Sequence, residues 1–222
     1  MNGKVCIVTG ASRGIGRAVA ESLGEAGAKL GLCAVQEAPL GPSFDQPQFS
    51  ARCDVSDEKQ VAHFFAECEQ RLGPPDVEVV NAGVLERVAI DEMSERQWDR
   101  VIDVNLKGAF LCARAVWPSM KARRSGRIVA LGSLSGTLGT PLASAYNASK
   151  WGLTGFVKSI AEEGREHGIF CALVLPGSVD TDMLELTPYA PDMTPGDVAR
   201  VVRFLALEAP MAMTGSAVEV FG

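Results

Sequence analysis

The chain has 222 residues, a length that fits one domain with a large buried core. Hydrophobic residues make up 47% of it, which is ordinary for a globular α/β protein. Its formal net charge of −6 argues against a nucleic-acid-binding domain, which usually presents a basic face. Only the segment 121–127 is locally basic, and a solvated helix end explains that better.

The cysteines and the hydropathy pattern exclude further classes. The cysteines are scattered, mostly inside apolar runs, and none forms a C-x-x-C pair, so we expect buried, reduced thiols in a cytoplasmic protein and no metal site. No signal peptide precedes the first predicted strand, and no apolar run reaches the roughly 18 residues of a membrane span. We therefore expect no membrane partner. The cysteines are Cys6, Cys33, Cys53, Cys68, Cys112 and Cys171.

The first elements form a strand, a glycine turn and a helix. Val5–Thr9 is an apolar run, Gly10–Gly16 is glycine-rich, and Arg17–Gly27 is amphipathic. Glycines let the backbone approach a diphosphate closely, and a helix N-terminus supplies unpaired N–H donors and positive potential. The spacing is G-x-x-x-G-x-G rather than G-x-G-x-x-G, and a plain turn with spare glycines is the alternative. Because a strand precedes the turn and a helix follows it, we predict nucleotide binding.

The next two strands are predicted over Leu30–Val35 and Phe49–Cys53. The connection 37–44 is rich in Pro and Gly and has no helical period, so we expect a loop there. Asp54 follows the third strand. It could cap the helix predicted over Glu58–Leu72, or its side chain could face an adenine ring.

A long helix is predicted over Glu95–Lys121, after the fourth strand, Val77–Val80. Asn105 lies inside this helix. Because Asn is a poor residue for a helix interior, we expect a local kink or a buried polar role there. Pro118 is expected to kink or end the helix.

The rest of the chain continues the alternation of strands and helices. Thr194 is expected to cap the last helix, with Pro195 in its first turn. The remaining predicted elements are the strands Ile128–Leu131, Phe170–Leu175 and Ala217–Val220, and a helix that opens at Ser144 and runs to about His167.

Tyr146 and Lys150 lie one turn apart on the same face of that helix. A neighbouring ammonium stabilises a phenolate, so it would lower the tyrosine pKa from its free value of about 10 and provide a general acid nearer neutral pH. Taken alone, Tyr-x-x-x-Lys is a weak signal, because surface pairs of this kind occur by chance in many helices.

The alternation predicts a single-domain α/β protein: a doubly wound, three-layer structure with a parallel sheet of about seven strands. In such a sheet, ligands bind beyond the carboxyl ends of the strands. Polar residues follow four of the predicted strand ends, so we expect them to converge on one site. They are Ser12, Asn81, Ser133 and Thr181.

Taken together, these motifs make the sequence similar to the short-chain dehydrogenase/reductase family, of the bacterial 3-oxoacyl-carrier-protein reductase type. The resemblance covers nearly the whole chain and implies a Rossmann-like fold. The residues that carry it are Thr9–Gly16, Asp54-Val55, Asn81-Ala82-Gly83, Asn105, Gly132-Ser133, Tyr146, Lys150 and Pro176-Gly177.

The resemblance implies an NAD(P)-dependent oxidoreductase that acts on a carbonyl or alcohol. Tyr146 would be the general acid in reduction, Lys150 would hold the nicotinamide ribose and lower the tyrosine pKa, and Ser133 would hydrogen-bond the substrate oxygen. Asn105 would anchor a water behind Lys150, and Thr181 would contact the nicotinamide carboxamide. The implied cofactor-binding residues are Gly10, Ser12, Arg13, Gly14, Ile15, Gly16, Asp54, Val55, Asn81, Ala82, Gly83, Tyr146, Lys150, Pro176, Gly177, Val179 and Thr181.

The expected cofactor is NADPH, with NADH accepted less well. Relatives that use NAD carry aspartate at the position of Ala34, where a carboxylate binds the adenosine ribose and repels a 2′-phosphate. Arg13 lies where NADPH-using relatives place a base beside that phosphate, and Ser12 could add a hydroxyl. Because Val35 stands where many of those relatives carry a second arginine, we expect a preference rather than exclusion of NADH.

The substrate stays open between a 3-oxoacyl thioester and a small ketone, quinone or sugar. The segment 182–193 is short for the family's substrate lid, and the loop 37–44 replaces a helix. A catalytically silent dinucleotide sensor or scaffold of the same fold is the alternative function. Such proteins typically lack part of the Ser-Tyr-Lys set, which is complete here.

Two of the predicted helices are apolar on more than one side. One stripe would face the sheet and the surplus a partner subunit, although burial within one chain would explain some of these side chains. The resemblance points to a homodimer or homotetramer built on these helices. The apolar residues include Phe110, Trp117, Trp151, Phe156 and Ile160.

Overall fold

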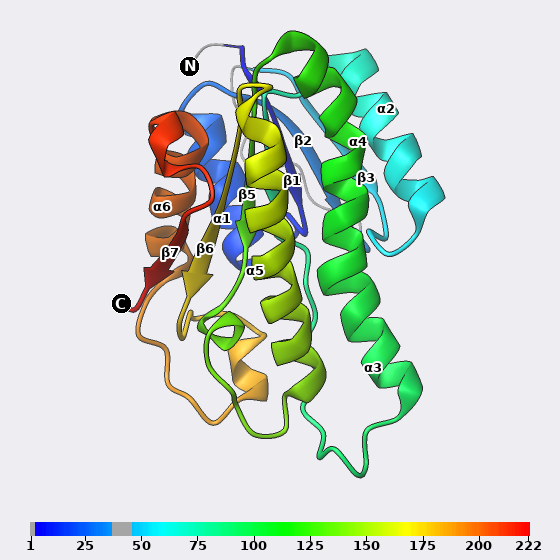
Figure 1. The fold of residues 1–222 in the computed structure, drawn as a ribbon, viewed down its shortest axis with the longest axis vertical. Helices are drawn as coiled ribbons and strands as arrows, with labels where there is room; N and C mark the ends of the chain where they lie inside the picture. Colours follow the sequence, from blue (N-terminus) through cyan, green and yellow to red (C-terminus); the bar gives the residue numbers. More distant parts are fainter. Residues whose placement is uncertain (1–2, 37–45) are drawn as a thin grey trace.

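The computed structural model describes residues 3–36 and 46–222, and its centre is one parallel sheet. The strand order is β3-β2-β1-β4-β5-β6-β7, so the direction of winding reverses between β1 and β4. Figure 1 shows β3 and β7 on opposite sides of the sheet, with β2, β1, β5 and β6 labelled between them. Their bounds are β1 Val5–Thr9, β2 Lys29–Ala34, β3 Gln48–Arg52, β4 Val77–Val80, β5 Gly126–Leu131, β6 Ile169–Pro176 and β7 Ala217–Val220.

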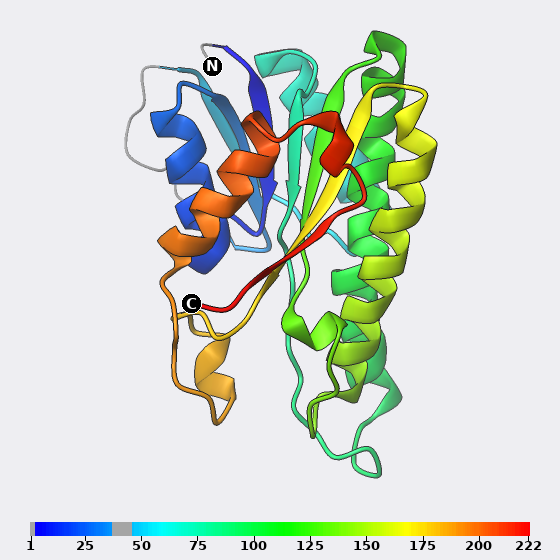
Figure 2. The same cartoon turned by 60° about the vertical axis from the view of Figure 1, so that its left-hand side comes forward.

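Helices cover both faces of the sheet and complete three layers (Figure 2). One face packs against α1 (Gly14–Glu25) and α6 (Pro195–Leu207). The other packs against α2 (Glu58–Leu72), α4 (Gly108–Arg123) and α5 (Ser144–Arg165). The inner strands β2, β1, β4, β5 and β6 are almost wholly buried, as parallel strands between helices are, whereas the edge strands β3 and β7 are only partly buried. The predicted doubly wound, Rossmann-like fold is confirmed.

The long predicted helix is divided by a π-helical turn. Glu95–Ile102 forms α3, Asp103–Lys107 is the π turn, and α4 follows. Asn105 is buried in this turn, as expected for a helix-interior Asn with a polar role. Of the two effects expected of Pro118, an end of the helix is wrong, since α4 continues to Arg123, and a kink stays a prediction. The packing of α4 against the sheet outweighs the hydrogen bond that proline removes.

Other helix ends differ from their predicted positions for local reasons. α1 begins at Gly14, because the second half of the glycine turn is already helical. Asp57 rather than Asp54 caps α2, whereas Thr194 caps α6 as predicted. The predicted loop 37–44 lies outside the described residues.

The cysteines confirm the prediction of buried thiols. All six are buried and none is in a disulfide. Within the described ranges, none of the helices combines the length and the apolar character needed to cross a bilayer.

Candidate active site

Two cavities open beyond the carboxyl ends of the strands and meet at Tyr146. The larger, of about 760 Å³, extends from the glycine turn to Lys150. The smaller, of about 380 Å³, lies between the loop after β5 and the segment 178–189. The residues common to both walls are Ile15, Leu85, Gly132, Tyr146, Thr181 and Met183.

The glycine turn is held against β4 by Asn81. Its side-chain amide donates to the carbonyls of Thr9 and Gly10 at 2.9 and 3.1 Å. A Cβ on Gly16 would lie 2.3 Å from the Asn81 amide nitrogen and from the Gly10 carbonyl oxygen. Gly16 is therefore not a spare glycine, since only glycine lets α1 approach this closely.

The first turn of α1 presents donors to the larger cavity. Arg13 takes the N-cap position with an extended backbone, but its side chain makes no cap hydrogen bond and the first turn holds no acid. Gly14, Ile15 and Gly16 line the cavity. Uncapped N–H groups and the positive end of the helix dipole fit a diphosphate, so the residues present suit a dinucleotide.

Asp54 lines the same cavity but does not cap α2. Its carboxylate accepts from the N–H and the hydroxyl of Ser56 at 2.9 and 2.7 Å. The cap role considered for it is therefore wrong, because Asp57 supplies that acceptor. Its position is compatible with the other expectation, a contact to adenine.

Arg13 lines the larger cavity, and a further arginine, Arg52, lies outside its wall. Arg13 forms an ion pair with Asp182 at 2.7 Å, and both side chains are largely exposed. Arg52 is not among the residues predicted from the sequence. It pairs with Ala34 in the parallel register, so the two side chains share a face of the sheet, and with Val35 it lines an adjoining hollow. Arg52 has no hydrogen bond or ion pair with another described residue.

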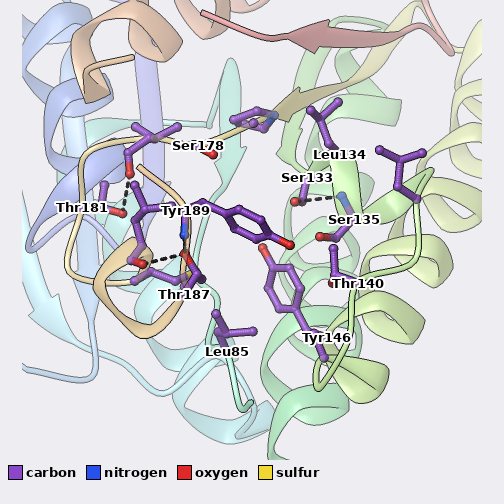
Figure 3. Close-up of a pocket in the computed structure, with 18 of the residues that line it drawn as sticks. Leu85, Ser133, Leu134, Ser135, Thr140, Tyr146, Ser178, Thr181, Thr187 and Tyr189 are labelled. Carbon is purple, nitrogen blue, oxygen red and sulfur yellow. Dashed lines mark hydrogen bonds between the residues drawn. The ribbon is translucent and has the colours of Figure 1, made fainter. Parts of the chain in front are cut away.

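Ser133, Tyr146 and Lys150 come together where the cavities meet. Ser133 follows β5, and its hydroxyl accepts from the Ser135 N–H at 3.1 Å (Figure 3). The same hydroxyl lowers the pKa of Tyr146, in opposition to the burial of that side chain. Lys150 is only 5% exposed; its Nζ donates to the Leu131 carbonyl at 2.7 Å and lies 5.6 Å from the centroid of the Tyr146 ring. A lysine ammonium has three donors, so two remain for a ligand.

Burial dominates the titration of both groups. It raises the pKa of Tyr146, and the hydroxyl of Ser133 offsets this only in part. The tyrosine pKa therefore lies above its ordinary value instead of nearer neutral pH as expected, because desolvation is the largest cause; a lowering of this pKa by Lys150 stays a prediction. Burial also lowers the pKa of Lys150 to about 8, so the ammonium is still charged at neutral pH.

Asn105 lines neither cavity, but it is connected to α5 by hydrogen bonds. Its Oδ1 accepts from the Val84 N–H at 2.8 Å, and its Nδ2 donates to the Val84 carbonyl and to the Ser149 hydroxyl. Ser149 in turn donates to the Tyr146 carbonyl at 2.7 Å. Asn105 in the π turn thus holds both the loop after β4 and the helix α5 in place. The predicted water behind Lys150 remains a prediction.

The smaller cavity holds a residue that sequence reasoning missed. Tyr189, the other of the chain's two tyrosines, comes from the short lid, and Figure 3 shows its hydroxyl pointing toward that of Tyr146. No motif around Tyr189 predicts a role for it, because its place in the cavity depends on how the segment 182–193 folds back over the site. Three residues predicted to bind cofactor line only this smaller cavity: Pro176, Gly177 and Val179.

Comparisons with known proteins agree with this geometry. Residues 4–190 match the family model for short chain dehydrogenases. The 3-oxoacyl-[acyl-carrier-protein] reductase FabG of Staphylococcus aureus is 36% identical, covering 99% of this chain and 97% of its own. MabA of Mycobacterium tuberculosis, a reductase of the same description, is 35% identical over 97% of this chain and 90% of its own. The crystal structure of gox2181 superposes with a TM-score of 0.92 at 32% identity, covering 100% of this chain and 95% of that one.

Proposed function

We propose that this protein, which belongs to the short-chain dehydrogenase family, reduces a carbonyl substrate with NADPH through Ser133, Tyr146 and Lys150. Membership makes it an NAD(P)-dependent oxidoreductase that transfers a hydride between its cofactor and a carbonyl or alcohol. One observation supports this assignment of residues: the larger cavity, which begins at the glycine turn, meets the smaller cavity at Tyr146.

The larger cavity is the proposed cofactor site. The free N–H groups at the start of α1 would bind the diphosphate. The two remaining donors of Lys150 would bind the ribose hydroxyls. Thr181 lines both cavities, so it would contact the nicotinamide at their junction. Bound there, the nicotinamide supplies the hydride, and the protein supplies position and a proton.

The hydroxyls of Ser133 and Tyr146 would stabilise the reaction. A carbonyl that receives a hydride develops negative charge on its oxygen, and two hydroxyl donors aimed at that oxygen lower the barrier. The raised pKa of Tyr146 keeps its proton in place at neutral pH, as an acid in reduction requires. The Lys150 ammonium would stabilise the phenolate left once that proton has moved.

Preference for NADPH would come from Arg13 and Arg52. Ala34 offers no carboxylate to bind or repel, and Arg52 lies across from it on the same face. Arg13 is the second cation, although its partner Asp182 competes for it. A 2′-phosphate would therefore meet two guanidinium groups instead of the single one expected from the glycine turn.

The curated relatives support a thioester substrate, and exposed apolar side chains support an assembly of subunits. The relatives reported above are described as 3-oxoacyl-[acyl-carrier-protein] reductases, so a 3-oxoacyl thioester is the first candidate substrate. Exposed aromatic side chains on α4 and α5 support a homodimer or homotetramer: Phe110 is 41% and Trp151 55% exposed.

The test uses the chain's two tyrosines. Oxidation of NADPH is followed by its absorbance with 3-oxoacyl thioesters and simple ketones, for wild type, Tyr146→Phe and Tyr189→Phe. Tyr146→Phe should lose at least about 10²-fold in turnover while binding NADPH nearly normally, since only the proton is removed. Tyr189→Phe should retain turnover.

Two outcomes would contradict the proposal. More than a few per cent of wild-type turnover in Tyr146→Phe would show that another group gives the proton. A wild type that binds NADPH but reduces none of the carbonyl compounds would favour the silent sensor.

A further inference from the structure

The smaller cavity has an uneven distribution of charge. Its lining includes one charged side chain, Arg87, and neither Asp nor Glu. This is unusual in a chain whose formal net charge is −6, and the larger cavity, by contrast, has Asp54, Asp103 and Asp182 in its wall. A cation without a counter-ion beside a proposed substrate site is available to an anionic ligand.

The position of Arg87 is fixed by its neighbours. The adjacent Glu86 is paired with Arg100 at 2.7 Å and does not take part in the cavity. The Val88 N–H donates to the Leu142 carbonyl at 2.8 Å, which ties the loop after β4 to the opposite wall. Arg87 itself is half-buried and has no hydrogen bond or ion pair with another residue in the ranges 3–36 and 46–222.

A half-buried guanidinium keeps strong donors available for a ligand. It carries five N–H groups in a planar fork that matches a carboxylate or a phosphate. The rest of the lining consists of apolar and hydroxyl side chains, such as Leu138, Leu184 and Thr140. A ligand that suits this wall has an apolar body, a carbonyl at Tyr146 and a negatively charged group at Arg87.

On these observations, and resting on the proposed function, we infer that the substrate is an anionic carbonyl compound whose carboxylate or phosphate binds Arg87. The carbonyl lies at Ser133 and Tyr146, and the anionic group at the loop after β4. The inference narrows the substrate class, because a neutral ketone or a neutral thioester leaves the guanidinium without an acceptor.

The experiment compares matched substrates that differ in one charge. One arm uses oxo-carboxylates of increasing chain length against their methyl esters. The other uses 3-oxoacyl-CoA, which carries phosphates, against the neutral N-acetylcysteamine thioester. Each pair is measured with wild type, Arg87→Gln, Arg87→Lys and the control Arg96→Gln, which removes an equal charge from an exposed site on α3 that lines neither cavity.

Wild type should prefer the anionic member of one arm by about ten-fold or more in kcat/KM, the size of one charge-assisted hydrogen bond. Arg87→Gln should remove most of that preference, mainly through KM. Arg87→Lys should keep part of it, and Arg96→Gln should leave it unchanged. The arm that responds identifies the anionic group as carboxylate or phosphate.

The contrary outcomes are separable. Reduction of neutral compounds with no preference for anions in either arm would overturn the inference and leave the proposed function standing. An equal loss of preference in Arg96→Gln would also overturn it, since the effect would then be general electrostatics. Failure of wild type to reduce any compound would overturn the proposed function, and this inference with it.

Discussion

The proposed mechanism needs the positive charge of Lys150, and burial makes that charge easier to lose. Burial lowers the pKa of its ammonium to about 8, whereas the pKa of the neighbouring Tyr146 is raised. As the pH rises through 8, the lysine therefore loses its charge while the tyrosine is still protonated. The acid survives, but the cation that would stabilise its conjugate base does not.

We therefore predict that kcat/KM for reduction is constant from about pH 6 to 7.5 and falls above about pH 8. A pH–rate profile on an uncharged substrate, with stability checked at each pH, measures this. In Lys150→Arg the residual activity should lack this falling limb, because a guanidinium keeps its charge. A limb that persists unchanged in that variant would assign it to another group.

Cofactor choice is also decided by single residues. Arg13→Ala and Arg52→Ala should each lower the NADPH-to-NADH ratio of kcat/KM, by up to about ten-fold at low salt, since exposed cations are screened. Asp182→Asn should raise the ratio, because it frees Arg13. Arg17→Ala is the control, since Arg17 already pairs with Glu21 on α1.

Either of two results would contradict the proposed role of Arg13 and Arg52 in selecting NADPH. One is a wild type that prefers NADH. The other is a ratio that responds to none of these substitutions, or to Arg17→Ala as strongly as to the substitutions of Arg13 and Arg52.

Among the elements, those with local signals were predictable and those built by long-range pairing were not. The glycine turn and the Thr194 cap depend on residues close in sequence, so the pattern alone locates them. Arg52 comes beside Ala34 in the wall of the larger cavity only through the register of β3 on β2, and Tyr189 reaches the smaller cavity only through the path of the lid. Neither relation leaves a periodic trace in the sequence.

The division of the long helix was half predictable. Asn105 marked an irregular point, because Asn disfavours helix interiors, but the π turn comes from its contacts to Val84 and Ser149. Pro118 does not end the helix, because local propensity takes no account of the packing of α4. Local chemistry thus indicated where the backbone is special, and tertiary contacts decided how.

The helices α4 and α5 provide the test of assembly. Trp151 is 55% exposed on α5, and the rings of Phe110 and Phe156 pack edge to face between α4 and α5. Wild type should sediment as a dimer or tetramer at micromolar concentration, and Trp151→Glu should shift it toward smaller species, because a buried unpaired charge is costly. Ile90→Glu, at a loop position that is 73% exposed, is the control. A wild-type monomer would reject the interface.

For the molecule as a whole, Glu78 is a stability problem in the centre of the sheet. It lies on β4 among α4-facing residues, fully buried, and neither carboxylate oxygen has a hydrogen-bond partner among the described residues. Burial raises its pKa from 4.5 to about 8. The same carboxyl raises the pKa of Cys112 and Cys171, after burial itself.

The sign of its effect on stability follows from that shift. A carboxyl with a raised pKa in the fold contributes its full stability below its unfolded pKa, and this is lost as the pH rises toward 8. We predict that Glu78→Leu raises the free energy of unfolding at pH 8 by about 2–4 kcal/mol and weakens the pH dependence. Glu78→Gln should weaken the pH dependence to the same extent, because it too lacks the carboxyl, but should gain less stability, since its amide remains polar and buried.

Thermal unfolding at pH 5 and pH 8 measures both effects, with Glu69→Gln as an exposed control on α2. If the difference in Tm between the two pH values is the same in wild type and Glu78→Gln, the buried carboxyl is not the cause.

Because all six cysteines are buried, the rates at which their thiols are labelled measure how often the structure around each one opens. A thiol reagent can modify a buried sulfur only when the structure around it opens, so each labelling rate reports an opening free energy. Cys53 lies in the wall of the larger cavity, whereas Cys6 and Cys171 are in the central sheet strands β1 and β6. Labelling followed by mass spectrometry would thus time the opening of the nucleotide end against the opening of the sheet, without adding a single probe to the chain.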